Sequence, residues 1–191
     1  MAGPMLNLHV VLCSTRPGRA GPPVAKWAVD RATAHGAYDV RLVDLAEVNL
    51  PLLDEPKHPR LGEYEHQHTK DWSALVAAAD AFVLVTPEYD YGMPATLLNA
   101  LHYLYQEWAY KAVAFVSYGG VSGGTRSVQM AKQVITTLKM MPIPEAVSLP
   151  FFTQQIKDGV FTPPEAQDKA AKLMLDELAK WSSALKPLRA P

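Results

Sequence analysis

Several features of secreted, membrane-bound or nucleic-acid-binding proteins are scarce in this sequence. Its 191 residues include one cysteine, Cys13, so no disulfide can form within the chain. The 18 Lys and Arg are balanced by 19 Asp and Glu and are scattered, which argues against a nucleic-acid partner. The apolar run Met5–Cys13 is far shorter than the roughly 20 residues of a membrane-spanning helix, and no basic residue precedes it. We therefore expect a soluble, cytoplasmic protein with no membrane partner.

The length and composition predict one folded domain over residues 1–191. Hydrophobic residues make up 49% of the chain and charged residues 19%, which suits a single well-covered core. Compact apolar runs predict strands at 6–12, 38–45, 81–86, 112–118 and 145–149, and helical patterns lie at 24–35, 71–79, 94–105 and 123–140. Apolar residues at spacings of three and four predict a last helix, with a buried stripe of Ala166, Ala170, Leu173, Met174, Leu178, Trp181 and Leu185.

Strands that are apolar throughout and alternate with helices predict a parallel sheet covered on both faces, which is a three-layer α/β fold. In such sheets ligands bind beyond the carboxyl ends of the strands. Three unusual loops follow the first, third and fourth predicted strands, at 14–22, 86–94 and 117–125. We expect the functional site where these loops meet. A fourth segment, 49–68, is rich in proline and charge and is expected to form a loop or a lid.

The first loop has the composition of a phosphate site. Residues 14–23 read STRPGRAGPP, with two hydroxyls and two arginines immediately before a predicted helix. Backbone N–H groups at a helix N-terminus, its positive dipole end and guanidinium groups all favour a bound dianion. Two solvated surface arginines are the plain alternative, but their position after a buried strand favours a ligand.

The second and third loops suit a flat ligand with polar edges. Residues 86–94 read TPEYDYGMP, which places a proline, two tyrosines and a glycine in one turn. Residues 117–125 read SYGGVSGGT, and its four glycines allow the backbone to approach a ring closely and to offer N–H groups. Alone, each loop is also compatible with an ordinary tight turn.

Together the three loops resemble the flavin site of the NAD(P)H-dependent FMN reductase family, and the resemblance covers nearly the whole chain. It implies a flavodoxin-like fold with a five-stranded parallel sheet of strand order 2-1-3-4-5. It also implies that the first loop binds the FMN phosphate and that the other two loops flank the isoalloxazine ring. The cofactor-binding residues implied are Ser14, Thr15, Arg16, Arg19, Pro87, Glu88, Tyr89, Asp90, Tyr91, Gly92, Ser117, Tyr118, Gly119 and Gly120.

The resemblance implies hydride transfer from NADPH or NADH to bound FMN. A small-molecule acceptor then takes the electrons, such as free flavin, a quinone, an azo compound or a metal oxyanion. The cofactor carries this chemistry, so we expect neither a catalytic base nor a metal. The family also implies a homodimer or homotetramer in which the slot for donor and acceptor lies at the interface between subunits. Residues 103–108 are then candidates to line the slot of the partner subunit. Trp108 and Tyr110 are equally compatible with ordinary packing.

Four positions depart from the family pattern. Asp90 stands where Asn is usual, Leu98 where Lys is usual, His102 where Asp is usual, and Cys13 where Gly or Ala is usual. A carboxylate at position 90 adds negative charge near the ring and would oppose a flavin anion.

Three other interpretations are considered. The chain could be a noncatalytic FMN protein that shuttles electrons or senses redox state. Cys13 and Arg19, separated by five residues after a strand, have the spacing of cysteine phosphatases and arsenate reductases, although Pro17 removes one N–H that such a loop uses. His66 and His68 form a pair typical of metal ligands, but no third ligand is evident in the sequence.

Overall fold

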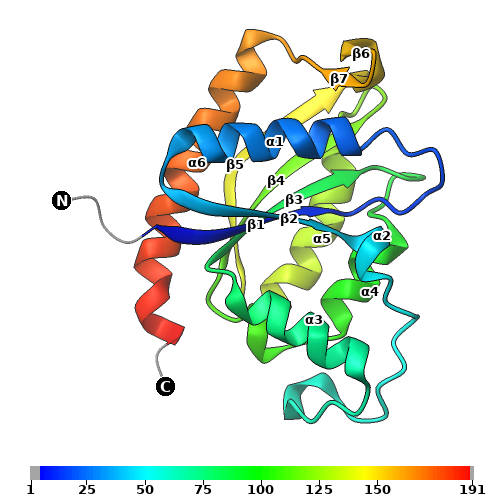
Figure 1. Cartoon of the computed structure of the whole chain (residues 1–191), viewed down its shortest axis with the longest axis vertical. Coiled ribbons are helices and arrows are strands. Elements are labelled where there is room, and N and C mark those ends of the chain that lie inside the picture. Colours follow the sequence, from blue (N-terminus) through cyan, green and yellow to red (C-terminus); the bar gives the residue numbers. More distant parts are fainter. Residues whose placement is uncertain (1–4, 190–191) are drawn as a thin grey trace.

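Five parallel strands form the centre of the protein, as a computed structural model that describes residues 5–189 shows (Figure 1). They are β1 (Leu6–Leu12), β2 (Tyr38–Asp44), β3 (Ala81–Pro87), β4 (Ala112–Gly119) and β5 (Met141–Pro150). Their order in the sheet is β2-β1-β3-β4-β5, and every neighbouring pair is parallel. The predicted sheet and its strand order are therefore confirmed.

Helices cover both faces of the sheet, which completes the three layers (Figure 1). One face carries α1 (Pro22–His35) and α6 (Glu165–Leu185), and the other carries α3 (Gln67–Ala78), α4 (Ala95–His102) and α5 (Thr125–Thr137). The single turn α2 (Leu45–Val48) follows β2, and short 3-10 turns lie at 59–61, 106–108, 152–155 and 186–189. Within residues 5–189, no helix is both long and apolar enough to cross a bilayer.

The strands divide their side chains between two cores. On β1, Leu8 and Val10 pack toward α1 and α6, whereas Val11 packs toward the α3–α5 face. Every residue of β3 is buried, as is every residue of β4 except its last. This is why those two strands read as continuous apolar runs in the sequence.

Some boundaries differ from those predicted. Helix α3 begins at Gln67, four residues before the predicted start, because the Glu55 carboxylate accepts hydrogen bonds from the backbone N–H groups of Glu65 and His66 and so organises this helix start. Helices α4 and α5 are shorter than the predicted ranges 94–105 and 123–140, and β5 is longer than 145–149. These differences lie at element ends, where local patterns carry the least information.

The predicted buried stripe of α6 is wrong in part. Leu173 and Trp181 are 55% and 37% exposed, and the buried residues of the helix are Ala171, Met174, Leu175, Leu178 and Ser182. The predicted set of apolar residues and the buried set overlap, because both contain Met174 and Leu178. Spacing alone therefore did not show which of the two sets faces the core.

A small antiparallel hairpin was not predicted. It consists of β6 (Ile156–Lys157) and β7 (Val160–Phe161), joined by Asp158 and Gly159, both with positive φ. Two-residue strands are too short to show a period, although an Asp-Gly pair between apolar residues is a known hairpin signal.

The core contains one histidine whose protonation should control acid stability. Burial, together with the nearby charges of Arg41 and Lys111, lowers the pKa of His9 from 6.5 to about 4. Because the unfolded chain then binds a proton more readily, stability is fully present above pH 6.5 and is lost as the pH falls toward 4. Through His9, the wild-type protein should lose on the order of 3 kcal/mol of its free energy of unfolding over that pH range. We expect His9→Leu to lack this loss when both proteins are compared by urea unfolding.

The matched control is His102→Leu, since His102 is exposed on α4. That variant should keep the wild-type pH profile. If the His9→Leu and wild-type profiles run parallel, His9 does not carry the acid dependence.

Candidate functional site

The loops after β1, β3 and β4 meet at the carboxyl edge of the sheet and enclose a cavity of about 300 Å³. Several of the predicted site residues line it, namely Ser14, Arg16, Arg19, Pro87, Glu88, Tyr89, Tyr118, Gly119 and Gly120. Thr15, Asp90, Tyr91, Gly92 and Ser117 belong to the same loops but are not among its lining residues. The three loops expected to meet therefore do meet around a cavity, and the binding role of their residues stays a prediction.

The turn after β5 also lines the cavity, through Phe151, Phe152 and Thr153. The sequence interpretation missed this turn because it lacks glycine and charge. The rule that ligands bind at carboxyl ends of strands would have found it, had it been applied to the last strand as well.

Residues 16–19 of the first loop form a tight turn. The N–H of Arg19 donates to the carbonyl of Arg16 at 3.0 Å, around Pro17 and Gly18, which has φ 70°. No described residue accepts a hydrogen bond from the backbone N–H of Thr15, Arg16 or Gly18. These N–H groups are therefore free to meet an anion.

The start of α1 differs from the expectation. Its first two residues are Pro22 and Pro23, which have no N–H, and the N–H of Ala25 donates to the carbonyl of Gly21. The first turn of the helix thus offers an anion the N–H of Val24 and the positive end of the helix dipole. Most N–H donors for an anion must therefore come from the loop itself.

The two arginines of the loop have different roles. Arg19 donates to the carboxylate of Asp44 at the end of β2 and to the carbonyl of Ser14, and its ion pair with Asp44 is largely buried. Arg16 is exposed, and none of the described carboxylates pairs with it. Arg19 therefore braces the loop, whereas Arg16 keeps its guanidinium available for an anion.

The second loop turns sharply over two residues. Tyr89 and Gly92 exchange backbone hydrogen bonds of 3.0 and 2.8 Å, and the two residues between them have positive φ, 47° at Asp90 and 66° at Tyr91. This is the geometry of a type I′ turn, in which Asp and Asn are both well tolerated at the first position. The Asp90 departure is therefore compatible with the turn.

Side chains connect the second loop to its neighbours. The hydroxyl of Tyr89 lies 2.6 Å from Oγ of Ser14, which joins it to the first loop. The Glu88 carboxylate accepts hydrogen bonds from the N–H of Arg126 at 3.0 Å and from its Nη1 at 2.8 Å, which joins it to the start of α5. The position of each loop therefore depends on the other two.

Glu88 remains ionised in this position. Burial by itself would raise the pKa of Glu88, but the hydrogen bonds from the Arg126 side chain, the Ser122 hydroxyl and the Arg126 N–H together lower it. Its negative charge also favours the positive end of α5. Glu88 therefore links the second loop to α5, and these contacts occupy its carboxylate.

The shape of the third loop depends on two glycines. Gly123 and Gly124 have φ 58° and 85°, and a Cβ on Gly124 would lie 2.7 Å from the backbone nitrogen of Tyr118. The hydroxyl of Ser117 donates to the carbonyl of Gly123 at 2.8 Å, so this predicted site residue holds the loop from inside. A Cβ on Gly120, by contrast, would meet nothing within 4 Å.

The Tyr118 side chain lines the cavity, and its hydroxyl is buried beside Gly21. The side chain is 4% exposed, and its hydroxyl has no hydrogen-bond partner among residues 5–189. Burial raises the pKa of Tyr118, so the group remains a neutral hydroxyl. A buried polar group without a partner is costly unless a ligand supplies one. Arg16 and the free N–H groups of the first loop have the chemistry to bind a phosphate such as that of FMN.

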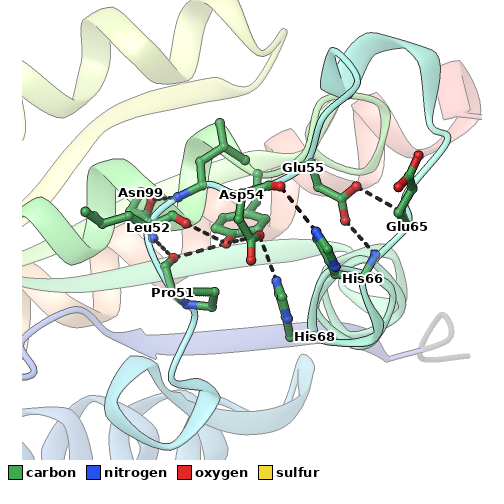
Figure 2. A network of polar contacts seen from close by, with 10 residues as sticks. Pro51, Leu52, Asp54, Glu55, Glu65, His66, His68 and Asn99 are labelled. Carbon is green, nitrogen blue, oxygen red and sulfur yellow. Dashed lines mark hydrogen bonds and ion pairs between the residues drawn. The ribbon is translucent and has the colours of Figure 1, made fainter.

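Segment 49–68 is fixed to the helices beside the site (Figure 2). Asn99 on α4 donates to the carbonyl of Pro51 at 2.7 Å, and Asp54 accepts a hydrogen bond from the Tyr103 hydroxyl and contacts His68, both at 3.0 Å. The segment is therefore tied to α3 and α4 along its length, which does not support the expectation of a lid. Across residues 5–189, no group of three or more His, Cys, Asp and Glu side chains is arranged to hold a metal ion.

The aromatic residues at 103–108 pack largely within their own chain. Tyr103 and Trp108 are buried, and Trp108 donates to the carbonyl of Leu101 at 3.2 Å. The structure thus favours ordinary packing for Trp108 over a place in a partner's slot.

Cys13 does not have the properties of a nucleophile. It is fully buried, and burial strongly raises the pKa of its thiol. The thiolate that a cysteine phosphatase needs is disfavoured there, and Arg19 is engaged with Asp44. These two observations argue against the phosphatase interpretation.

Known proteins similar to this chain include an FMN reductase and an azoreductase. The family model described as NADPH-dependent FMN reductase matches residues 6–154. An NAD(P)H-dependent FMN reductase of Schizosaccharomyces pombe is 40% identical over 159 residues, which cover 82% of this chain and 79% of that protein. An NADPH azoreductase of a Bacillus species is 33% identical over 128 residues, 66% of either chain.

A solved structure supports the fold. FerB, a flavoenzyme NAD(P)H:(acceptor) oxidoreductase from Paracoccus denitrificans, superimposes with a TM-score of 0.73. The match covers 94% of this chain and 98% of that one at 18% sequence identity, so it shows that the fold is shared.

The role of the third loop can be tested with a pair of glycine variants. Gly124→Ala places a Cβ against the backbone of Tyr118 at a positive φ, and we expect it to lower the free energy of unfolding by about 2 kcal/mol or more. Gly120→Ala is the matched control, because its Cβ enters open space. Urea unfolding of both apoproteins makes the comparison, and equal stabilities would contradict the proposed constraint at Gly124.

Proposed function

Since this chain belongs to the NADPH-dependent FMN reductase family, we propose that its cavity holds FMN and that the electrons pass to a small planar acceptor. Membership makes the chain an FMN-dependent oxidoreductase that uses NADPH or NADH. The observation that carries the assignment of the cavity is the set of unused donors beside it, above all Arg16 and the free N–H groups of the first loop.

We assign the phosphate to the first loop. Ser14, Thr15 and Arg16 supply two hydroxyls, free backbone N–H groups and a guanidinium without an ion-pair partner among the described residues. Arg19 adds positive charge while its pair with Asp44 keeps the loop in shape. Charge-assisted bonds of this kind are stronger than neutral ones, so Arg16 should dominate phosphate binding.

The isoalloxazine ring is assigned to the second and third loops. The N–H groups of Asp90 and Tyr91 have no acceptor within residues 5–189 and are free to meet a ring edge. Gly119 and Gly120 line the cavity with backbone alone, which permits close approach of a flat group. In this assignment Pro87, Glu88, Tyr89, Gly92, Ser117 and Tyr118 shape the two loops.

The chain contributes binding and orientation to the reaction. FMN, when bound, accepts the hydride and delivers electrons to the second substrate. The bonds of Glu88 to α5 and of Tyr89 to Ser14 hold the loops in place before the cofactor arrives. Such preorganisation lowers the cost of binding, and the reaction needs no catalytic base from the protein.

The rim of the site favours planar aromatic acceptors over metal oxyanions. Tyr89, Tyr91 and Phe151 are exposed there, and aromatic faces bind flat rings by stacking. A quinone, an azo compound or free flavin meets this requirement, and one similar protein is an azoreductase. We also infer a homodimer or homotetramer, supported by the exposed apolar side chains of Tyr91 and Met130 beside the rim. Sedimentation that shows monomer alone at assay concentration would contradict the assembly.

The proposed function predicts the visible spectrum of the purified protein. FMN-loaded protein should be yellow, and anaerobic addition of NADH or NADPH should bleach its absorption; the faster donor is the preferred one. A quinone, an azo dye and a metal oxyanion are then compared as acceptors, and reoxidation should be faster with the first two. A folded protein that stays colourless with excess FMN would contradict the proposal.

The phosphate assignment predicts a specific loss of affinity. We expect Arg16→Ala to weaken FMN binding roughly 10- to 100-fold, since a hydrogen bond to a charged group contributes about 1.5–3 kcal/mol. Flavin fluorescence during titration of the apoprotein gives the dissociation constant. Arg41→Ala, an exposed arginine on β2, is the matched control and should bind FMN like the wild type. An unchanged dissociation constant in Arg16→Ala would show that the phosphate lies elsewhere.

A further inference from the structure

The turn after β5 presents an aromatic surface to the cavity. Phe151 lines the cavity and is 50% exposed, although it directly follows a strand with buried residues such as Leu149. A half-exposed phenylalanine buries little apolar area against its own chain, so packing alone gives it little reason to be there.

Phe151 also adopts an unfavourable backbone conformation. Its φ and ψ are 48° and 34°, the left-handed region that glycine adopts easily and a bulky residue rarely does. Two hydrogen bonds hold it there. The N–H of Phe151 donates to the carbonyl of Gly120 at 3.2 Å, and the N–H of Gln154 donates to the carbonyl of Phe151 at 3.0 Å. The turn is thus attached to the Gly-rich loop of the flavin site.

The next residue, Phe152, has a packing role that explains its position in the turn. The ring of Phe152 lies 4.6 Å from the ring of Tyr118, centroid to centroid, and belongs to the core beneath α1 and α6. This contact holds Tyr118, which also lines the cavity. Phe152 is a positioning residue in this arrangement, whereas nothing comparable accounts for Phe151.

We propose that Phe151 contacts the cofactor, with its ring forming an aromatic wall of the cavity against bound FMN. The proposal rests on the proposed function and extends the site to a fourth loop. Strained conformations of non-glycine residues cluster at ligand sites, where the surroundings impose them. A phenylalanine at a position that suits glycine is explained if its ring gains contact area when the cofactor binds.

The test separates the ring from the backbone conformation. Phe151→Gly and Phe151→Asn both tolerate a positive φ but remove the ring, whereas Phe151→Tyr keeps it. The matched control is Tyr110→Gly, because Tyr110 is an aromatic residue of similar exposure, 37%, with φ 59°, located just before β4 at the opposite edge of the sheet. FMN dissociation constants come from flavin fluorescence, and apoprotein stability comes from urea unfolding.

We expect Phe151→Gly and Phe151→Asn to weaken FMN binding roughly tenfold, and Phe151→Tyr and Tyr110→Gly to stay within about twofold of the wild type. The Phe151→Gly apoprotein should be at least as stable as the wild type, because glycine relieves the strained conformation. A loss of affinity with full stability is the expected signature of a lost cofactor contact.

Different results overturn different claims. If Phe151→Gly binds FMN like the wild type while Arg16→Ala binds it weakly, the role of Phe151 is wrong and the proposed function stands. An equal loss of affinity in Phe151→Gly and Tyr110→Gly would also overturn the role of Phe151, because the effect would then be general. If the wild-type protein itself fails to bind FMN, the proposed function and this inference both fall.

Discussion

The alignment of the carboxyl ends of β1, β3, β4 and β5 along one edge of the sheet is the constraint on which the whole site depends. Parallel pairing places all four following turns at the same edge, although they are far apart in the sequence. Residues of both cores reach this edge, among them Tyr118 and Met93. Hydrogen bonds also connect the turns with one another: Ser14 with Tyr89, Glu88 with Arg126, and Phe151 with Gly120.

The polar groups of the site fall into two sets with different purposes. Arg19, Glu88 and the Ser117 hydroxyl are fully engaged inside the protein, where they set the shape of the loops. Arg16 has no ion-pair partner in the described part of the chain, and the N–H groups of Thr15, Arg16, Gly18, Asp90 and Tyr91 have no acceptor there. A site that is ordered before its ligand arrives and retains unused donors is suited to hold a cofactor with an anionic tail.

The sequence predicted the sheet well because buried parallel strands carry a strong signal. The apolar runs of β3 and β4 and the loops that follow them were identified from residue types alone, and the cavity lies among those loops. The buried face of α6 was misassigned at Leu173 and Trp181, because helical spacing does not show which of two overlapping faces meets the sheet. The turn after β5 was overlooked, since Phe151 owes its importance to its position and conformation and not to its residue type.

The sequence by itself determined the family, the order of elements and the three loops that meet at one edge of the sheet. These follow from patterns that are local along the chain, such as a glycine-rich loop after a buried strand. Only the tertiary structure decided which arginine is available to a ligand. Arg16 and Arg19 are alike in the sequence of the loop, but in the fold Asp44 at the end of β2 pairs with Arg19 alone. The contacts of Glu88 were decided in the same way, by a partner brought near through the pairing of strands distant in sequence.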